Sequence, residues 1–525
     1  MKYYKYNFNL SKFSKIKKDL IFFMIYFCIF SLLLLPIWLN KKFGLIYFDQ
    51  FKFNLTLLYY GYLDGDSNVV NSAIKWFIII PIFLSIIFFY IKKLISFFYI
   101  NKDNSIEIII KKLKSIKKNY FKFKINKLIV LINFFVNKIF LLIISVIIFI
   151  LFYSFTNFFK KPLKVSNLDY LDLNYEYPSV YSEGKNKNLV LLYVESLEKT
   201  WSNQNIFNED LIKEISDIKE GKSVKYFDQI PALGYTFSSL VSTQCGIPLL
   251  KISNSYMDSK DLKGINKFLP NLTCLSDILA DHNYENIFLS SDYLENSLTD
   301  IFLLTHNYSQ LFGLNELTNM GYKTSKNAYH NKNKWSGGIH DNVLLKASID
   351  ILKKQKNNNK NFFMTIMTLD THSPAGTPNQ ECLKKISDQR NLNRYTFKES
   401  FKCTSRYVSE FVKEFNNLNF ENTQLIILGD HLLMKNLGDI VNINERYIFN
   451  KFFIDGALEI KRDHINFFDF YPSILEIMNF KIKNKKGKVA LGYSIFKKND
   501  DYKVISSHMR GRSKLYDTFW QISTK

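Results

Sequence analysis

The stretch Tyr226–Leu250, YFDQIPALGYTFSSLVSTQCGIPLL, is the part of the sequence around which the rest is organised, and Thr236 is its centre. The pattern predicts a short helix over residues 237–244, ended by Gly246 and then Pro248, because a glycine and then a proline are typical of helix C-termini. Thr236 would then lie at the helix N-terminus, where free backbone N–H groups and the helix dipole favour a phosphate or an alkoxide. A threonine in this place is also typical of a simple N-cap.

Three apolar runs elsewhere in the sequence are typical of buried central strands, and each ends in a side chain that could bind a metal or a phosphate. The runs are residues 188–194, 361–368 and 423–428, and they lead to Glu195, to His372 and to Asp430-His431. A shorter strand is expected at residues 287–289, before Asp292, and helices are expected at 272–280, 341–355 and 397–415.

Alternating strands and helices predict an α/β domain with a mostly parallel central sheet. The carboxyl ends of parallel strands lie at one edge of such a sheet, which is where these folds bind ligands. We therefore expect Glu195, Asp430 and His431 to converge beside Thr236. Two carboxylates, one imidazole and one hydroxyl form a plausible four-ligand shell for a single Zn²⁺ or Mn²⁺ ion.

The first 160 residues hold long apolar runs, whereas all eight histidines come after residue 280. This asymmetry predicts a membrane domain over residues 1–156, a linker over 157–187 and a catalytic domain over 188–525. Spans are expected at about 20–39, 76–91 and 139–155, since each is close to the length that crosses a bilayer. Residues 44–63 are expected to lie at the membrane interface, with a further crossing as the alternative, and residues 106–118 to form a basic amphipathic helix on the inner leaflet.

The formal net charge of +23 is compatible with nucleic acid or with a membrane surface as a partner. Because the lysines cluster beside the apolar runs, we favour the membrane and expect no nucleic-acid partner. The lysine bias places the N-terminus inside and everything after residue 156 outside. A lysine-, asparagine- and isoleucine-rich composition is also typical of an AT-rich genome.

Four of the five cysteines lie in the outer part, and an oxidising compartment would pair them. The spacing leaves the pairing open, and our hypothesis is the sequence-local choice, Cys245–Cys274 and Cys382–Cys403. Cys28 is expected to be a packed thiol in the first span. Metal binding by cysteines is disfavoured, because no C-x-x-C spacing occurs.

Three blocks of sequence make the family recognisable. Val194-Glu195-Ser196-Leu197-Glu198, the block from Tyr235-Thr236 to Leu249, and Gly429-Asp430-His431-Leu432 resemble the sulfatase/alkaline-phosphatase-like membrane transferases. The similarity is greatest to phosphoglycerol transferases of periplasmic glucans, and lipoteichoic acid synthases and phosphoethanolamine transferases are more distant relatives. Two further segments, Thr305-His306-Asn307 and Cys274 to Asp277, also look like family positions.

The resemblance implies metal ligands at Glu195, Thr236, Asp430 and His431, with Thr236 also the nucleophile. His372 would bind the phosphate or protonate the leaving group. The expected substrate contacts are Asp292, His340 and Asp341. This chain departs from the family pattern at Ser290-Ser291, at His340 before Asp341, and in its three expected spans instead of four or five.

The implied reaction is transfer of a phosphoglycerol head group from phosphatidylglycerol to a hydroxyl of a periplasmic or cell-surface glycan, through a phospho-threonine intermediate. The alternative is phosphoethanolamine transfer from phosphatidylethanolamine to lipid A or a surface glycan. Either reaction would place the protein in the bacterial inner membrane as a multi-pass protein, with its catalytic domain in the periplasm or outside.

Other classes of protein fit the sequence less well. A sulfatase would need a Cys/Ser-x-Pro-x-Arg setting, and the residues that follow Thr236 do not supply it. A two-metal phosphatase would need more clustered Asp and His ligands. A non-enzymatic glycan-binding relative would not need the complete set of four metal-binding residues.

Overall fold

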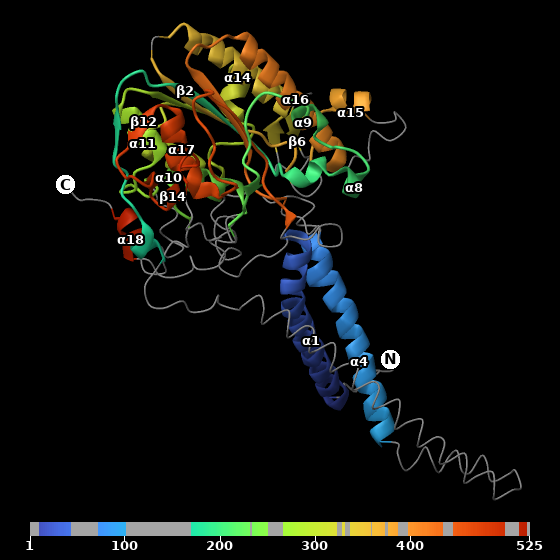
Figure 1. The fold of residues 1–525 in the computed structure, drawn as a ribbon. Helices are drawn as coiled ribbons and strands as arrows, with labels where there is room; N and C mark the ends of the chain where they lie inside the picture. The colour runs from blue at the N-terminus through green and yellow to red at the C-terminus, as the bar shows by residue number, and fades with distance from the viewer. Residues whose placement is uncertain are drawn as a thin grey trace, which may run out of the picture. The chain divides into compact units, whose positions relative to one another are not determined.

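The computed structural model describes residues 10–43, 72–100, 170–230, 234–249, 266–322, 328–330, 337–358, 360–372, 376–386, 397–433, 445–498 and 514–521. These residues form two compact units (Figure 1). The described helices before residue 101 belong to the first unit, and the described elements from residue 170 onward belong to the second.

The described residues of the first unit form α1 (Leu10–Phe43) and α4 (Ile80–Ile100), the latter preceded by a π-helical turn, η1 (Lys75–Ile79). The two helices pack together through the rings of Phe30 and Phe88, whose centroids lie 5.1 Å apart. Residues Asp19–Leu39 and Ser72–Ile91 are long and apolar enough to cross a bilayer. They match two of the three expected spans, whereas residues 139–155, 44–63 and 106–118 lie outside the described residues. Cys28, expected to be packed, is instead free and exposed on α1.

The second unit is built around a six-stranded sheet in the order β10-β9-β2-β8-β4-β5. Its strands are β2 (Asn188–Val194), β4 (Glu285–Ser290), β5 (Gln310–Phe312), β8 (Phe362–Met367), β9 (Thr423–Gly429) and β10 (Asn450–Phe453). All neighbouring pairs are parallel except β10 with β9, which is antiparallel. The predicted α/β fold with a mostly parallel sheet is therefore confirmed, and the antiparallel edge strand β10 is an addition to it.

Strand β2 shows why the sheet is buried on both faces. Leu189, Leu191 and Tyr193 pack into one hydrophobic core, and the alternate residues of the same strand pack into a second core. The first core is covered by α10 (Thr236–Cys245), α11 (Leu275–Asp281), α12 (Thr299–Thr305) and α17 (Phe470–Ile477). The second is covered by α13 (Leu314–Asn319), α14 (Asp341–Lys356) and α16 (Phe397–Asn417). A continuous apolar run is what a strand covered on both faces requires.

The remaining elements are short. The helices are α7 (Tyr170–Asn174), α8 (Gln204–Phe207), α9 (Lys213–Ser216), α15 (Gln380–Ile386) and α18 (Lys514–Phe519), with 3-10 turns η2 (Lys199–Ser202), η4 (Asn296–Leu298) and η7 (Phe467–Asp469). The paired strands are β1 (Val180–Ser182) with β12 (Phe480–Ile482), β3 (Tyr226–Phe227) with β11 (His464–Ile465), β6 (Ala328–His330) with β7 (Gly337–Ile339), and β13 (Lys488–Val489) with β14 (Gly492–Tyr493).

Both expected disulfides are present and therefore confirmed. Cys245–Cys274 joins the end of α10 to the residue before α11. Cys382–Cys403 joins α15 to α16. Each bridge ties together two helices that follow one another along the chain.

Candidate functional site

Glu195 is the first residue after β2, the strand that lies between β9 and β8. Its side chain is 2% exposed, and its backbone N–H donates to the Thr368 hydroxyl at 3.1 Å. The next residue, Ser196, has a left-handed backbone with φ of 54°, and its hydroxyl donates to Glu195 Oε1 at 2.6 Å. A non-glycine residue in this conformation is uncommon and is often found at functional sites. The turn directs Glu195 across the end of the sheet.

Thr236 is the first residue of α10, and the N-cap position belongs to Tyr235. The simple N-cap interpretation of Thr236 is therefore wrong. Its hydroxyl donates instead to Glu195 Oε2 at 3.2 Å and lies 3.5 Å from His431 Nε2. The helix ends as predicted, because Gly246 adopts the left-handed conformation with φ of 66°.

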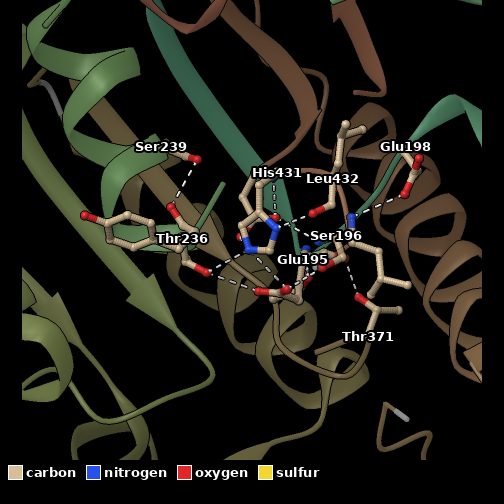
Figure 2. Close-up of polar contacts among 12 residues, drawn as sticks. Glu195, Ser196, Glu198, Thr236, Ser239, Thr371, His431 and Leu432 are labelled. Carbon is tan, nitrogen blue, oxygen red and sulfur yellow. Dashed lines mark hydrogen bonds and ion pairs between the residues drawn. The ribbon is translucent and has the colours of Figure 1, made fainter. Parts of the chain in front are cut away.

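Asp430 and His431 follow β9 directly and are each 1% exposed. Asp430 Oδ1 accepts hydrogen bonds from the backbone N–H groups of Ser196 at 2.7 Å and of His431 at 2.8 Å. His431 Nδ1 donates to the Leu432 carbonyl at 2.9 Å, which leaves the lone pair of Nε2 facing Thr236 and Glu195. Figure 2 shows the His431 ring close to Thr236 and Glu195.

The structure thus brings together the four predicted ligands from three separate segments. His431 Nε2 lies 3.5 Å from Glu195 Oε1 and 3.4 Å from Asp430 Oδ2. A tetrahedral zinc shell with bonds of about 2.1 Å has ligand atoms about 3.4 Å apart. Among the described residues, Asp430 Oδ2 is also a buried oxygen without a hydrogen-bond partner. The spacing and this orphaned oxygen both fit a single divalent cation held by Glu195, Thr236, Asp430 and His431.

The pKa values of Glu195, Asp430 and His431 are all shifted, because the three side chains are buried and close together. Burial and then the charge of Glu195 raise the pKa of Asp430. Burial opposes ionisation of Glu195 as well, but the imidazoles of His431 and His372 lower its pKa overall. Burial disfavours the protonated form of His431, whereas Asp430 and Glu195 favour it and raise its pKa. Two carboxyl groups and an imidazole are therefore held close together out of water, an arrangement that a bound divalent cation would stabilise.

His372 follows the last residue of β8, the strand beside β2, by five residues, and its side chain is exposed. It is close enough to Glu195 for its charge to affect the pKa of that carboxyl group. An exposed imidazole next to a buried ligand cluster is suitably placed to meet a substrate that enters from solvent.

The three expected substrate contacts lie in different surroundings. Asp292, which follows β4, accepts hydrogen bonds from the Tyr293 backbone and from Asn296, both at 2.8 Å. His340 and Asp341 precede and begin α14 and are 6% and 0% exposed. Both bond to the segment between β8 and His372.

Two supporting residues, Arg446 and Thr371, could not be singled out from the sequence. Glu198 is fully buried and forms a bidentate ion pair with Arg446, with distances of 2.6 and 2.8 Å. The Thr371 hydroxyl donates to the Glu195 carbonyl. Glu198 lies within a motif that the sequence did point to, whereas Arg446 and Thr371 carry no local signal.

A second group of possible ligands, Cys274, Asp277 and His306, also lies close together. The sulfur of Cys274 is used in the disulfide, and Asp277 accepts from the Cys274 backbone at 2.8 Å and pairs with His306 Nδ1 at 2.8 Å. These residues cap α11 and join it to α12, so their chemistry is structural.

The sulfatase family model matches residues 187–479, which is more than half of the chain. The chain belongs to the sulfatase family. The matched range begins just before β2 and includes all four residues of the cluster. The resemblance seen in the motifs is thereby confirmed.

Curated relatives are named phosphoglycerol transferase I. The protein of that name from Citrobacter koseri is 29% identical over 314 residues, which is 58% of this chain and 39% of the relative. The one from Escherichia coli O6:K15:H31 is 29% identical over 264 residues, which is 50% of this chain and 33% of the relative. The match therefore spans only about two fifths or less of these relatives.

Solved structures show a distant likeness. The lipoteichoic acid synthase LtaP from Listeria monocytogenes is 14% identical with a TM-score of 0.44, covering 63% of this chain and 80% of that one. The Streptococcus pyogenes phosphoglycerol transferase GacH, in complex with sn-glycerol-1-phosphate, is 14% identical with a TM-score of 0.39, covering 59% and 78%. Similarities of this size are too weak to add to the family match.

Proposed function

We propose that this protein transfers a phosphoglycerol group from phosphatidylglycerol to a hydroxyl of a cell-envelope glycan, with Thr236 as the nucleophile. The observation that carries the proposal is the position of the Thr236 hydroxyl, 3.2 Å from Glu195 Oε2 and 3.5 Å from His431 Nε2, at a helix N-terminus. The name shared by the curated relatives supports phosphoglycerol as the transferred group.

A divalent cation held by Glu195, Thr236, Asp430 and His431 would lower the pKa of the Thr236 hydroxyl and offset the charge of the phosphate. In the first step, Thr236 Oγ1 gives its proton to its hydrogen-bond partner Glu195 Oε2 and forms a bond to phosphorus, while the bond from phosphorus to the diacylglycerol oxygen breaks. His372 donates the proton that the departing diacylglycerol oxygen needs. The phosphoglycerol group then remains on Thr236 as a covalent intermediate.

In the second step, the glycan hydroxyl attacks the phosphorus and gives its proton to His372, while the bond from phosphorus to Thr236 Oγ1 breaks and Oγ1 takes its proton back from Glu195. The first N–H groups of α10 have no acceptor within the helix, and they point along its axis toward the phosphate oxygens. They therefore stabilise the charge that develops on those oxygens in both steps. The exposed position of His372 lets the same residue serve donor and acceptor in turn.

A lipid donor also accounts for the two long apolar helices that precede the catalytic domain. We infer a multi-pass protein of the bacterial inner membrane whose catalytic domain lies outside the cytoplasm. The two disulfides support an oxidising compartment for that domain. A bilayer anchor would hold the site near lipid head groups.

The test is intact-mass measurement of the detergent-solubilised full chain after incubation with Zn²⁺ or Mn²⁺ and with vesicles of pure phosphatidylglycerol or pure phosphatidylethanolamine. We expect one added phosphoglycerol unit on Thr236 after exposure to phosphatidylglycerol. The adduct should be absent in Thr236→Ala and present at a reduced rate in Thr236→Ser, the matched control. Addition of phosphoethanolamine alone would identify the other head group, and full lipid turnover by Thr236→Ala would overturn the covalent route.

A further inference from the structure

Asp341, the first residue of α14, is wholly buried and holds the backbone that leads from β8 to His372. Its Oδ1 accepts the backbone N–H groups of Leu369 at 2.9 Å and of Asp370 at 3.1 Å. A carboxylate oxygen that accepts two consecutive N–H groups fixes the path of that backbone, because losing it would leave both donors buried and unpaired.

The contact between the two segments is reciprocal. The Asp341 N–H donates to Asp370 Oδ2 at 3.0 Å, and His340 Nδ1 donates to Asp370 Oδ1 at 2.8 Å. From α16, the Thr404 hydroxyl donates to Asp341 Oδ2 at 2.8 Å. Residues 369–370 are therefore tied to the start of α14, and through Thr404 to α16.

The residues on both sides of this tie contact the proposed metal ligand Glu195. On one side, the Thr368 hydroxyl accepts from the Glu195 N–H at 3.1 Å. On the other, the Thr371 hydroxyl donates to the Glu195 carbonyl, and His372 follows immediately. A displacement of residues 369–370 would thus move Glu195 and His372 relative to each other.

We propose that Asp341 is a positioning residue, which acts on the transfer reaction by holding residues 368–372 so that His372 faces the Thr236 cluster. The inference rests on the proposed function, since it assigns a purpose to the place of His372. It departs from the substrate contact expected for Asp341, because both of its oxygens are engaged by protein donors.

Hydrogen–deuterium exchange of the full chain tests the positioning without requiring any activity. Asp341→Leu should raise exchange at the Leu369 and Asp370 amides at least about tenfold. Asp341→Asn should keep most of the protection, because its carboxamide oxygen can still accept both N–H groups. Thr404→Val is the milder variant that keeps the test valid if Asp341→Leu does not fold, and it should give a smaller rise at the same amides. Unchanged exchange at these two amides in the folded variants would overturn the proposal.

The matched control is Asp277→Leu, which removes a partly buried carboxylate of similar bonding at the start of α11. It should leave exchange at residues 369–370 as in the wild type. A rise of equal size there would mean that general loosening of the domain, and not Asp341, controls the segment, and would also overturn the proposal.

Kinetics with vesicles containing both phosphatidylglycerol and phosphatidylethanolamine test the consequence. Asp341→Leu should lower kcat about 10- to 100-fold, which is the range typical of residues that hold a functional side chain in place through hydrogen bonds. The KM for lipid and the amount of bound metal should both stay unchanged. Asp341→Asn should restore most of kcat. In a His372→Ala background, Asp341→Leu should lower kcat no further, because the two act through one group. If the losses of kcat caused by Asp341→Leu and His372→Ala multiply in the double variant, Asp341 does not act through His372 and the proposal is refuted. If the wild type shows no turnover, the proposed function is refuted, and the hydrogen–deuterium exchange result alone decides whether Asp341 positions residues 368–372.

Discussion

Replacing Arg446 by leucine should destabilise the catalytic domain more than any exposed charge substitution. Arg446 Nε and Nη2 donate to the two carboxylate oxygens of Glu198, whose side chain is 0% exposed, against 5% for Arg446. Arg446 also donates to the Leu433 carbonyl at 3.0 Å. The pair therefore holds the segment after His431 against the turn that follows Glu195.

The magnitude follows from the charge that remains. Among the described residues, the donors that remain for Glu198 without Arg446 are the Leu433 N–H at 3.2 Å and the Thr200 hydroxyl at 2.8 Å. Removing one partner of a buried ion pair costs about 3–5 kcal/mol. Since domain stabilities are about 5–15 kcal/mol, the variant should unfold at a clearly lower urea concentration.

Urea unfolding of the detergent-solubilised chain is the assay, followed by tryptophan fluorescence. Trp201 is a suitable reporter, because it is 2% exposed and its indole N–H donates to the Ser196 carbonyl at 3.0 Å. The double replacement of Glu198 and Arg446 by leucine should recover part of the loss, because it removes the unpaired charge. The matched control is Arg406→Leu, which breaks an exposed pair with Glu410 and should cost no more than about 1 kcal/mol. A loss below about 1 kcal/mol for Arg446→Leu, or a double variant as unstable as the sum of the two single ones, would refute the reasoning.

Three further predictions concern pH, the disulfide of α10 and the metal. Burial and then the charge of Asp370 raise the pKa of Asp341 to about 7, so the folded state binds an extra proton relative to an unfolded chain with a pKa of about 3.9. The stability of the wild type relative to Asp341→Asn should therefore fall by up to roughly 4 kcal/mol as pH rises from about 4 to about 7; urea unfolding across that range would contradict this if the difference stayed constant or grew. Replacing Cys245 and Cys274 by serine should cost about 3–4 kcal/mol, because the bridge closes a separation of 29 residues, and an unchanged thermal midpoint would count against this. Elemental analysis should find about one divalent cation per wild-type chain and much less in His431→Ala or after dialysis against a chelator; a metal-free wild type after incubation with Zn²⁺ and with Mn²⁺ would contradict the ligand assignment.

Much of the fold follows from local pattern. The run at residues 188–194 is β2 itself, and the runs at 361–368 and 423–428 match β8 and β9 within a residue at each end. Composition alone is enough to locate these strands, because a strand buried on both faces is a continuous apolar run whose ends are marked by the first polar residues. The meeting of Glu195 with Asp430 and His431 then follows, since neighbouring parallel strands end at the same edge.

The supporting residues could not be predicted, because their partners depend on long-range placement. Glu198 and Arg446 are 248 residues apart, and nothing near either one indicates the other. Asp341 looks like an ordinary acidic residue in the first turn of a helix, which is a common place for one. Its contact with Leu369 and Asp370 exists only because α14 begins beside the end of β8. The antiparallel strand β10 was missed for the same reason, since its pairing with β9 is not encoded in its own four residues.

Gly429 shows how a local residue type and a long-range contact combine to make the site. It is the last residue of β9, and a Cβ atom there would lie 1.9 Å from the Leu197 carbonyl oxygen, far inside any allowed contact. Only a residue without a side chain lets the turn after β2 pass this close to the end of β9. That approach is what allows Asp430 Oδ1 to accept the Ser196 N–H at 2.7 Å and places Asp430 beside Glu195. The glycine before the Asp-His pair therefore sets the separation of two strand ends, and through it the spacing of the proposed metal ligands beside Thr236.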